Sequence, residues 1–309
     1  MKRKNPDRFL DVDDVDTGEL IDLLDRATTR KRQLYEDGHS AGGPLAGHTL
    51  GMLFEKPSTR TRMSFETGMT QLGGHAVFLG PDVIHLGHGE PIRDTARALS
   101  GYVDLVMARL FDHADIETFA EYAGVPVING LTDDAHPCQT LADLLTIKEH
   151  VGLDAPVAFV GDGNNVARSL VIGAAMVGLD LTVATPEGYG VGDDVLERAG
   201  TLGRRPTITH DPVAATEGAA VVYTDVWVSM GEEDERERKL ADFRAADFQV
   251  DAELLGDAYL MHCLPAHRGE EVTDDALERE NALVWDQAEN RIHAQKALMV
   301  HLLDDRGGS

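Results

Sequence analysis

The sequence predicts an α/β fold with two domains, each built on a central parallel sheet that is flanked by helices. Short apolar runs alternate with amphipathic helical stretches along the chain, a pattern typical of βαβ units. No internal repeat or low-complexity segment interrupts this alternation. With 309 residues the chain can bury one large core or two ordinary ones, and two domains are the better expectation.

The first half of the chain contains four apolar runs that we expect to be strands. These strands are Thr49–Phe54, Ala76–Leu79, Val103–Ala108 and Val125–Ile128. The expected helices are one that begins at Ser58, then Pro91–Tyr102, Asp115–Ala123 and Pro137–Val151.

The second half repeats the pattern, so both halves are expected to be Rossmann-like domains that meet near residue 150. Its expected strands are Val157–Val160, Leu181–Ala184, Thr207–Thr209, Ala220–Thr224, Ala258–His262 and Leu283–Trp285. Its expected helices are Val166–Val177, Asp194–Leu202 and Glu289–Leu303. Ligands of such sheets bind at the carboxyl ends of the strands, which is where we look for functional residues.

The formal net charge of −26 is spread along the chain rather than gathered in a tail. A surface of this kind repels itself at low ionic strength and is tolerated where salt screens it, so we expect a halophilic source. An acidic protein that binds basic partners is the alternative, but no single acidic face is evident. The charge also argues against nucleic acid as a partner.

The composition predicts a cytoplasmic protein with no membrane partner. Hydrophobic residues make up 42% of the chain, and no apolar run approaches the length of a membrane span. The basic segment Met1–Lys4 is followed by Asn5–Arg8, where a signal peptide needs apolar residues. Cys138 and Cys263 are the two cysteines, too few for a disulfide framework.

The string Glu55–Arg62 follows the first strand directly and places Ser58, Thr59, Arg60 and Thr61 in the first turn of a helix. A helix start offers free N–H groups to a phosphate, while hydroxyl and guanidinium groups add donors that match its oxygens. The alternative is a serine-capped amphipathic helix with solvated arginines. That reading explains the serine but not such dense positive charge in an acidic protein.

Two further groups of donors follow the next strands of this half. Arg109 comes just after Val103–Ala108 and is either a surface charge or an anion clamp. His136 and Gln139 flank Pro137, a residue that favours the first position of a helix, so both should lie at the helix start. Taken by itself, His136 is equally well explained as a histidine that caps the helix and binds no ligand. Donors at three strand ends favour an anion site.

The turn after Val157–Val160 resembles a dinucleotide fingerprint only poorly. Gly161 and Gly163 give the first two glycines, but the third is missing and no acidic residue ends the next strand. A nicotinamide-dependent dehydrogenase is therefore disfavoured. Asn165, at the turn from strand to helix, is instead a candidate for binding a small polar ligand.

Asp225 and Ser229 follow the strand Ala220–Thr224 and stand four residues apart, so they share a face if the segment is helical. A carboxylate beside a hydroxyl suits an ammonium group. An Asp225 that merely caps a helix is a serious alternative.

The strand Ala258–His262 ends in His262-Cys263-Leu264-Pro265. A lone buried cysteine is more often a small core residue than a functional one. Because neighbouring strand residues point to opposite faces, His262 and Cys263 are not expected to share a zinc ion. We therefore do not expect a zinc site at this strand end. Arg291, near the start of the last helix, is either surface charge or one more anion ligand.

Taken together, these strings resemble the ornithine carbamoyltransferase family from Phe9-Leu10 to the final helix. Ser58–Thr61, Arg109 and His136–Gln139 match segments shared by all transcarbamoylases. Asp225–Gly231 and His262–Pro265 match segments specific to ornithine, and aspartate enzymes carry a different segment at the latter place. The resemblance implies transfer of a carbamoyl group from carbamoyl phosphate to the δ-amine of L-ornithine, giving citrulline and phosphate.

The resemblance also assigns roles to the candidate residues. Residues 1–148 would bind carbamoyl phosphate, 149–291 would bind ornithine, and 292–309 would return to pack on the first domain. The implied carbamoyl-phosphate ligands are Ser58, Thr59, Arg60, Thr61, Arg109, His136, Gln139, Arg291 and the backbone of Cys263 and Leu264. The implied ornithine ligands are Asn165, Asp225, Ser229 and Met230, with Cys263 beside the δ-amine. Arg60, Arg109, His136 and Cys263 would be the catalytic residues. The resemblance implies orientation rather than covalent catalysis, and therefore neither a cofactor nor a metal.

The family is built on trimers, sometimes assembled further, and a neighbouring subunit completes each site. Ile84–Gly87 matches the donated segment, with His85 where many relatives have glutamine. Two alternatives stay open. One is a transcarbamoylase that uses putrescine or an N-acylornithine, and the other is a non-catalytic binding relative.

Overall fold

The computed structural model describes residues 8–38, 43–81, 90–229 and 231–304, which form two compact α/β units. The first unit comprises residues up to Ala142 and from Arg291 onwards, and the second comprises Asp143–Asn290. Among the described helices, none is long and apolar enough to cross a membrane.

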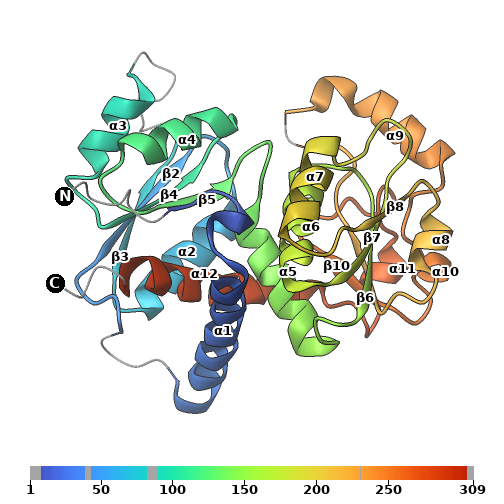
Figure 1. The fold of residues 1–309 in the computed structure, drawn as a ribbon, viewed down its shortest axis with the longest axis horizontal. Coiled ribbons are helices and arrows are strands. Elements are labelled where there is room, and N and C mark those ends of the chain that lie inside the picture. The colour runs from blue at the N-terminus through green and yellow to red at the C-terminus, as the bar shows by residue number, and fades with distance from the viewer. Residues whose placement is uncertain (1–7, 39–42, 82–89, 230, 305–309) are drawn as a thin grey trace. The chain divides into compact units, whose positions relative to one another are not determined.

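The first unit is built on a parallel sheet in which five strands of the described chain pair in the order β1-β5-β4-β2-β3 (Figure 1). The strands are β1 (Arg8–Phe9), β2 (Thr49–Phe54), β3 (His75–Leu79), β4 (Leu105–Arg109) and β5 (Val127–Leu131). The helices are α1 (Thr17–Asp37), α2 (Thr59–Gln71), α3 (Ile92–Leu99), α4 (His113–Tyr122) and the start of α5 (Pro137–His150). From β2 the chain goes to β3 on one side and to β4 on the other, so the topological switch point lies between β2 and β4.

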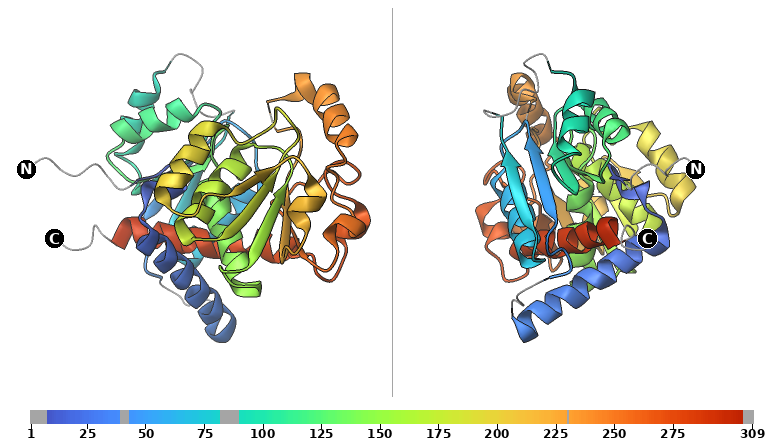
Figure 2. Two further views of the ribbon diagram at one scale, coloured as in Figure 1. Left: turned by 45° about the vertical axis from the view of Figure 1, so that its right-hand side comes forward. Right: turned by 90° about the vertical axis from the view of Figure 1, so that its left-hand side faces the viewer.

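The second unit repeats this plan, with five strands of the described residues in the order β10-β9-β6-β7-β8. The strands are β6 (Pro156–Val160), β7 (Asp180–Ala184), β8 (Thr207–Thr209), β9 (Val221–Thr224) and β10 (Tyr259–His262). The helices are α6 (Asn165–Val177), α7 (Asp193–Leu202), α8 (Pro212–Thr216), α9 (Arg236–Ala245), α10 (Ala252–Leu255) and α11 (Asp274–Leu277). Its switch point lies between β6 and β9. The left view of Figure 2 shows strands of this second sheet, and the right view shows strands of the first sheet.

Apolar strands form the centre of both sheets because helices cover them. Every residue of β4 and β9 is buried, as expected for parallel strands that are covered on both faces. In the second unit Trp227 stacks on Phe243 with ring centroids 5.1 Å apart, inside a core that also contains Phe248. The predicted α/β fold with two parallel sheets is therefore confirmed.

The last helix, α12 (Val284–Asp304), packs on α2 in the first unit through its part from Arg291 onwards. Lys296 Nζ donates to Gln71 Oε1 at 2.8 Å. Gly68 makes room for this helix, because a Cβ there would lie 3.3 Å from the side chains of Lys296 and Met299.

One expected strand was wrong, and one long helix was not predicted. Leu283–Trp285 is not a strand: Leu283 N donates to Leu260 O at 2.8 Å beside β10, but α12 begins at Val284. The helix α1 was not predicted, although Asp16 and Glu19 form a capping box at its start. The other predicted strands are present with ends displaced by at most three residues, for example Val127–Leu131 for Val125–Ile128.

Candidate functional site

In the first unit, the start of α2 lies directly after β2, at the switch point of its sheet. Ser58 caps the helix, and its Oγ accepts from Thr61 N at 3.3 Å. The Thr61 side chain is fully buried, and its Oγ1 accepts from Ser58 Oγ at 3.0 Å and from Arg291 Nη2 at 2.9 Å. The hydroxyl cluster and Arg291 are therefore parts of one arrangement, and Arg291 is buried rather than a surface charge.

Arg109 ends β4 on the other side of the switch point, where its residue position pairs with Phe54 of β2. His136 precedes Pro137, the first residue of α5, and Gln139 N donates to His136 O at 3.0 Å. Arg109, His136 and Gln139 are all buried. The structure therefore places these three predicted residues at the carboxyl ends of neighbouring strands.

The surroundings of His136 lower the pKa of its ring. Burial holds its pKa well below the ordinary value of a histidine, and the charges of Arg291 and Arg109 lower it further. The ring is therefore neutral at physiological pH and offers one N–H donor. Burial also raises the pKa of the nearby Cys138 thiol to about 12, so Cys138 is not a nucleophile.

We call Ser58, Thr59, Arg60, Thr61, Arg109, His136, Gln139 and Arg291 the cationic set. Arg60 is partly exposed in the first turn of α2, and Thr59 is exposed. Arg62 is not part of the set, because its guanidinium lies over Phe78 at 4.0 Å and pairs with Glu66 at 3.1 Å. Three arginines beside a helix start and hydroxyl donors suit an anion such as a phosphate. His85 lies outside the described residues.

In the second unit, β9 and β10 bring a carboxylate and a thiol together. Thr224 pairs with His262, so the residues that follow them, Asp225 and Cys263, leave the sheet side by side. Cys263 Sγ donates to Asp225 Oδ1 at 2.9 Å, and Asn164 Nδ2 donates to Asp225 Oδ2 at 2.8 Å. Both oxygens of this buried carboxylate are thus held in place, beside the switch point between β6 and β9.

The remaining ornithine candidates lie near these strand ends. Asn165 is the first residue of α6, and Asn164 caps that helix through its side-chain oxygen. The segment 225–229 is not helical, so the argument that Asp225 and Ser229 share a helical face does not apply. Asp225 does not cap a helix either. Met230 lies outside the described residues, and we call Asn165, Asp225, Ser229 and Cys263 the anionic set.

Leu264 adopts a left-handed backbone conformation with φ of 61°, which is unusual for a leucine. Its N–H donates to His262 Nδ1 at 2.9 Å. The other ring nitrogen of His262, Nε2, therefore carries a hydrogen and faces Glu271 Oε1 at 3.0 Å. His262 and Glu271 are fully buried, and they hold the backbone that follows Cys263.

The expectation that His262 and Cys263 diverge was wrong, because β10 ends at His262 and its alternation stops there. One ligand atom each from Asp225, His262 and Cys263 lies within 4.8 Å of the others. These side chains already bond to each other or to Leu264 and Glu271, so we assign no metal to them.

A second group that satisfies the same criterion is His267, Glu270 and Glu271. Arg236 already forms an ion pair with Glu270, and Glu271 accepts from His267 N at 2.6 Å. This group is explained by ion pairing and hydrogen bonding, so it is not assigned a metal either.

The Gly161–Gly163 turn has a structural explanation. A Cβ on Gly163 would lie 2.3 to 2.5 Å from the backbone of Gly190 and Val191, and Gly163 N donates to Tyr189 O at 2.8 Å. The second glycine of the G-x-G string is thus required by a close approach of two backbones.

The sequence reasoning missed Asn164, which holds Asp225, and the buried pair of Asp162 with Lys239. For Asn164 the signal was available, because asparagine directly before a helix is a favoured cap. For Lys239 no local signal existed: the residue lies within a charged helix, and only its burial distinguishes it.

Comparisons with known proteins agree with this division into two sets. Residues 8–149 match the model of the carbamoyl-P binding domain of the aspartate/ornithine carbamoyltransferases. Residues 154–302 match the model of their Asp/Orn binding domain.

Individual relatives are similar over nearly the whole chain. The chain is 64% identical to an ornithine carbamoyltransferase of Haloquadratum walsbyi, in an alignment that covers 96% of this chain and 98% of that protein. It is 49% identical to a catabolic ornithine carbamoyltransferase of Halobacterium salinarum, with 96% and 99% covered. Among solved structures, the ornithine carbamoyltransferase of Pyrococcus furiosus superposes with a TM-score of 0.89 at 49% identity, with 95% and 96% covered.

Proposed function

The chain belongs to the aspartate/ornithine carbamoyltransferase family, and from this premise we propose that it transfers the carbamoyl group of carbamoyl phosphate to the δ-amine of L-ornithine. The products are L-citrulline and phosphate. The opposite charge of the two sets carries the proposal: the cationic set suits the phosphate group of an acyl phosphate, and the buried carboxylate of Asp225 suits the α-ammonium group of an amino acid. The domains would be 1–148 with 292–309 for the first substrate and 149–291 for the second.

In this proposal the cationic set binds and polarises carbamoyl phosphate. Ser58, Thr59, Thr61 and the start of α2 hold the phosphate, together with Arg60 and Arg109. The neutral ring of His136 donates to the carbonyl oxygen, which is consistent with its lowered pKa. Gln139 and Arg291 position the carbamoyl end. Each donor gains strength as negative charge develops on that oxygen, the requirement of an oxyanion hole.

The anionic set binds and orients ornithine. Asp225 and Ser229 receive the α-amine, and Asn165 with Met230 receives the carboxylate. Cys263 lies beside the δ-amine, while the backbone carbonyls of Cys263 and Leu264 accept from the carbamoyl NH₂. The hydrogen bonds that hold Asp225 and the Leu264 backbone support these placements.

The reaction then needs no covalent enzyme intermediate. The lone pair of the neutral δ-amine attacks the carbonyl carbon and forms a tetrahedral intermediate. The C–O bond to phosphate then breaks and its electron pair leaves with the phosphate, while the amine nitrogen gives its proton to the departing phosphate. Orientation and charge stabilisation supply the catalysis.

We also propose a cytoplasmic homotrimer, or a multiple of trimers, in which His85 contacts the phosphate in a neighbouring site. Light scattering in concentrated KCl measures the subunit number, and a monomer that is fully active would contradict the shared site.

The function is tested by following citrulline formation from carbamoyl phosphate and L-ornithine in concentrated KCl. Putrescine, N-acetylornithine and L-aspartate are assayed in parallel, and we expect turnover with ornithine alone. In D225N the KM for ornithine should rise roughly tenfold to a hundredfold, as for loss of a hydrogen bond to a charged group, with the KM for carbamoyl phosphate little changed. D180N, at an exposed aspartate paired with Arg204, is the matched control. Turnover with another amine would overturn the assignment to ornithine.

A further inference from the structure

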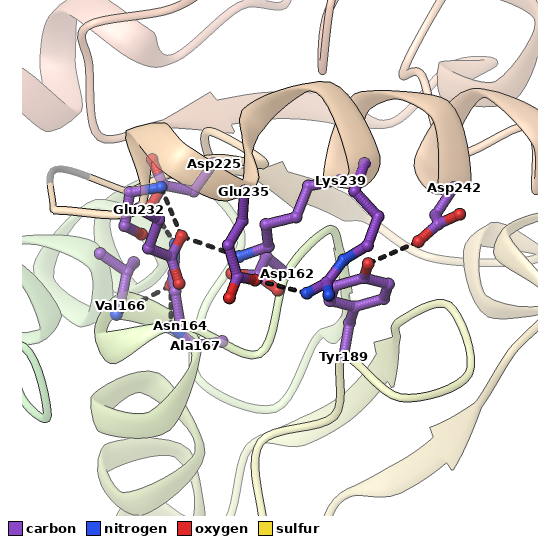
Figure 3. A network of polar contacts seen from close by, with 12 residues as sticks. Asp162, Asn164, Val166, Ala167, Tyr189, Asp225, Glu232, Glu235, Lys239 and Asp242 are labelled. Carbon is purple, nitrogen blue, oxygen red and sulfur yellow. Dashed lines mark hydrogen bonds and ion pairs between the residues drawn. The ribbon is translucent and has the colours of Figure 1, made fainter.

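Lys239 of α9 is a buried lysine that the proposed reaction does not use. Its side chain is 4% exposed, whereas lysines are almost never fully buried unless they are paired. Its Nζ lies 2.8 Å from Asp162 Oδ2 and 2.8 Å from Glu232 Oε2, and 5.6 Å above the ring of Tyr189 (Figure 3). One cation thus joins two carboxylates that are 70 residues apart in the sequence.

One of these carboxylates belongs to the turn that holds Asp225. Asp162 lies between β6 and α6, two residues before Asn164, whose Nδ2 donates to Asp225 Oδ2. Gly163 between them is fixed by the backbone of Tyr189 and Gly190. A displacement of Asp162 would therefore be transmitted along a short and stiff turn to Asn164 and to the carboxylate of Asp225.

The other carboxylate belongs to the segment that carries Ser229. Glu232 Oε2, the same oxygen that faces Lys239, also accepts from Ser229 N at 2.8 Å. Figure 3 shows Glu232 and Asp162 on either side of the Lys239 ammonium group, with Asn164 and Asp225 next to them. The contacts run in one unbroken series from Ser229 through Glu232, Lys239 and Asp162 to the turn that carries Asn164.

The charges of this series are mutually dependent. Burial opposes the positive charge of Lys239, but the charges and hydrogen bonds of Asp162 and Glu232 outweigh it, so the pKa of Lys239 is raised. Burial raises the pKa of Asp162 to about 6, although Lys239 opposes this. A buried ion pair is weak evidence for stability, because packed apolar side chains often serve stability equally well. The fixed geometry of the ion pair therefore says more about the role of Lys239 than its contribution to stability does.

We propose that Lys239, with Asp162 and Glu232, is a positioning residue that sets the distance between Ser229 and Asp225 and so determines the affinity for the amino-acid substrate. None of the three touches substrate in this account. The inference rests on the proposed function, because it takes Ser229 and Asp225 as the groups that bind the α-amine of ornithine.

The experiment compares K239M, which keeps most of the apolar stem, with K239R, which restores a cation. R238M is the matched control, since it removes one charge from the neighbouring exposed residue of α9, whose partner is Glu235. In K239M we expect the KM for ornithine to rise about tenfold or more, a factor that corresponds to roughly 1.4 kcal/mol. The KM for carbamoyl phosphate should stay the same, K239R should recover part of the loss, and R238M should resemble the wild type.

A second readout does not depend on activity. Hydrogen exchange of the Ser229 amide, which Glu232 protects, should become faster in K239M than in the wild type or R238M. An equal rise of both KM values, or a KM for ornithine that does not change in folded K239M, would overturn the proposal. So would unchanged Ser229 exchange. If the wild type itself fails to use ornithine, the proposed function fails, and the exchange measurement still decides whether Lys239 positions Ser229.

Discussion

His136 is buried beside Arg109 and Arg291, and its burial and these cations oppose a positive charge on its ring. The position has a consequence for stability as well as for catalysis. In the unfolded chain a histidine titrates near its ordinary pKa of about 6.5. Below that pH the unfolded state binds a proton at this residue that the folded state does not bind, so acid favours unfolding.

We therefore predict that part of the acid sensitivity comes from His136. As the pH falls below about 6.5, this residue alone should lower the free energy of unfolding by up to about 1.4 kcal/mol per pH unit. In H136Q that contribution disappears, since glutamine does not titrate. Urea unfolding of both proteins between neutral and mildly acidic pH measures the difference, in which the other histidines cancel. Parallel pH profiles for the two proteins would contradict the prediction.

At the scale of single elements, the turn from β6 to α6 shows how packing selects a residue. Gly163 approaches the backbone of Gly190 so closely that a side chain has no room. The neighbouring Asn164 caps α6 with one end of its amide and holds Asp225 with the other. This turn is thus both a helix start and a support for the anionic set.

We predict opposite effects for the same substitution at two glycines of this unit. G163A should destabilise the protein, because its Cβ would collide with backbone atoms that cannot move as a flexible side chain can. G200A should stabilise it by roughly 0.5–1 kcal/mol, because Gly200 lies inside α7 with nothing within 4 Å of a new Cβ. Thermal melting of both variants measures this, and a G163A that melts with the wild type would show that the turn can adapt.

At the scale of the whole molecule, the net charge of −26 is the dominant property. The ornithine carbamoyltransferase that is 64% identical to this chain comes from the halophile Haloquadratum walsbyi, in agreement with the expected adaptation to salt. Like charges on one folded chain repel each other, and salt screens this repulsion. At 1 M ionic strength the Debye length is about 3 Å, so charges farther apart than this hardly interact. The charges of the unfolded chain lie farther apart and repel each other less, so added salt stabilises the folded state more than the unfolded state.

We predict that the melting temperature rises with KCl into the molar range. Betaine, a solute without net charge, does not screen charge and is the control at equal concentration. A protein that is equally stable without salt, or equally stabilised by betaine, would show that charge repulsion does not limit its stability.

The sequence by itself determined the elements whose causes are local. The alternation of apolar runs with amphipathic stretches led to both parallel sheets, and the serine and proline signals led to the starts of α2 and α5. The rule that ligands bind where parallel strands end directed the choice of candidate residues. The resemblance of the motifs supplied the family, in agreement with the comparisons.

The tertiary structure decided every feature that depends on residues far apart in the chain. Only folding brings Arg291 to Thr61, Cys263 to Asp225, and Lys239 to Asp162. It also decided that a helix begins at Val284 where a strand was expected, and that His262 and Cys263 lie together where β10 ends. The physical reason is that burial and charge pairing belong to a place in space, whereas propensity and capping belong to a few consecutive residues.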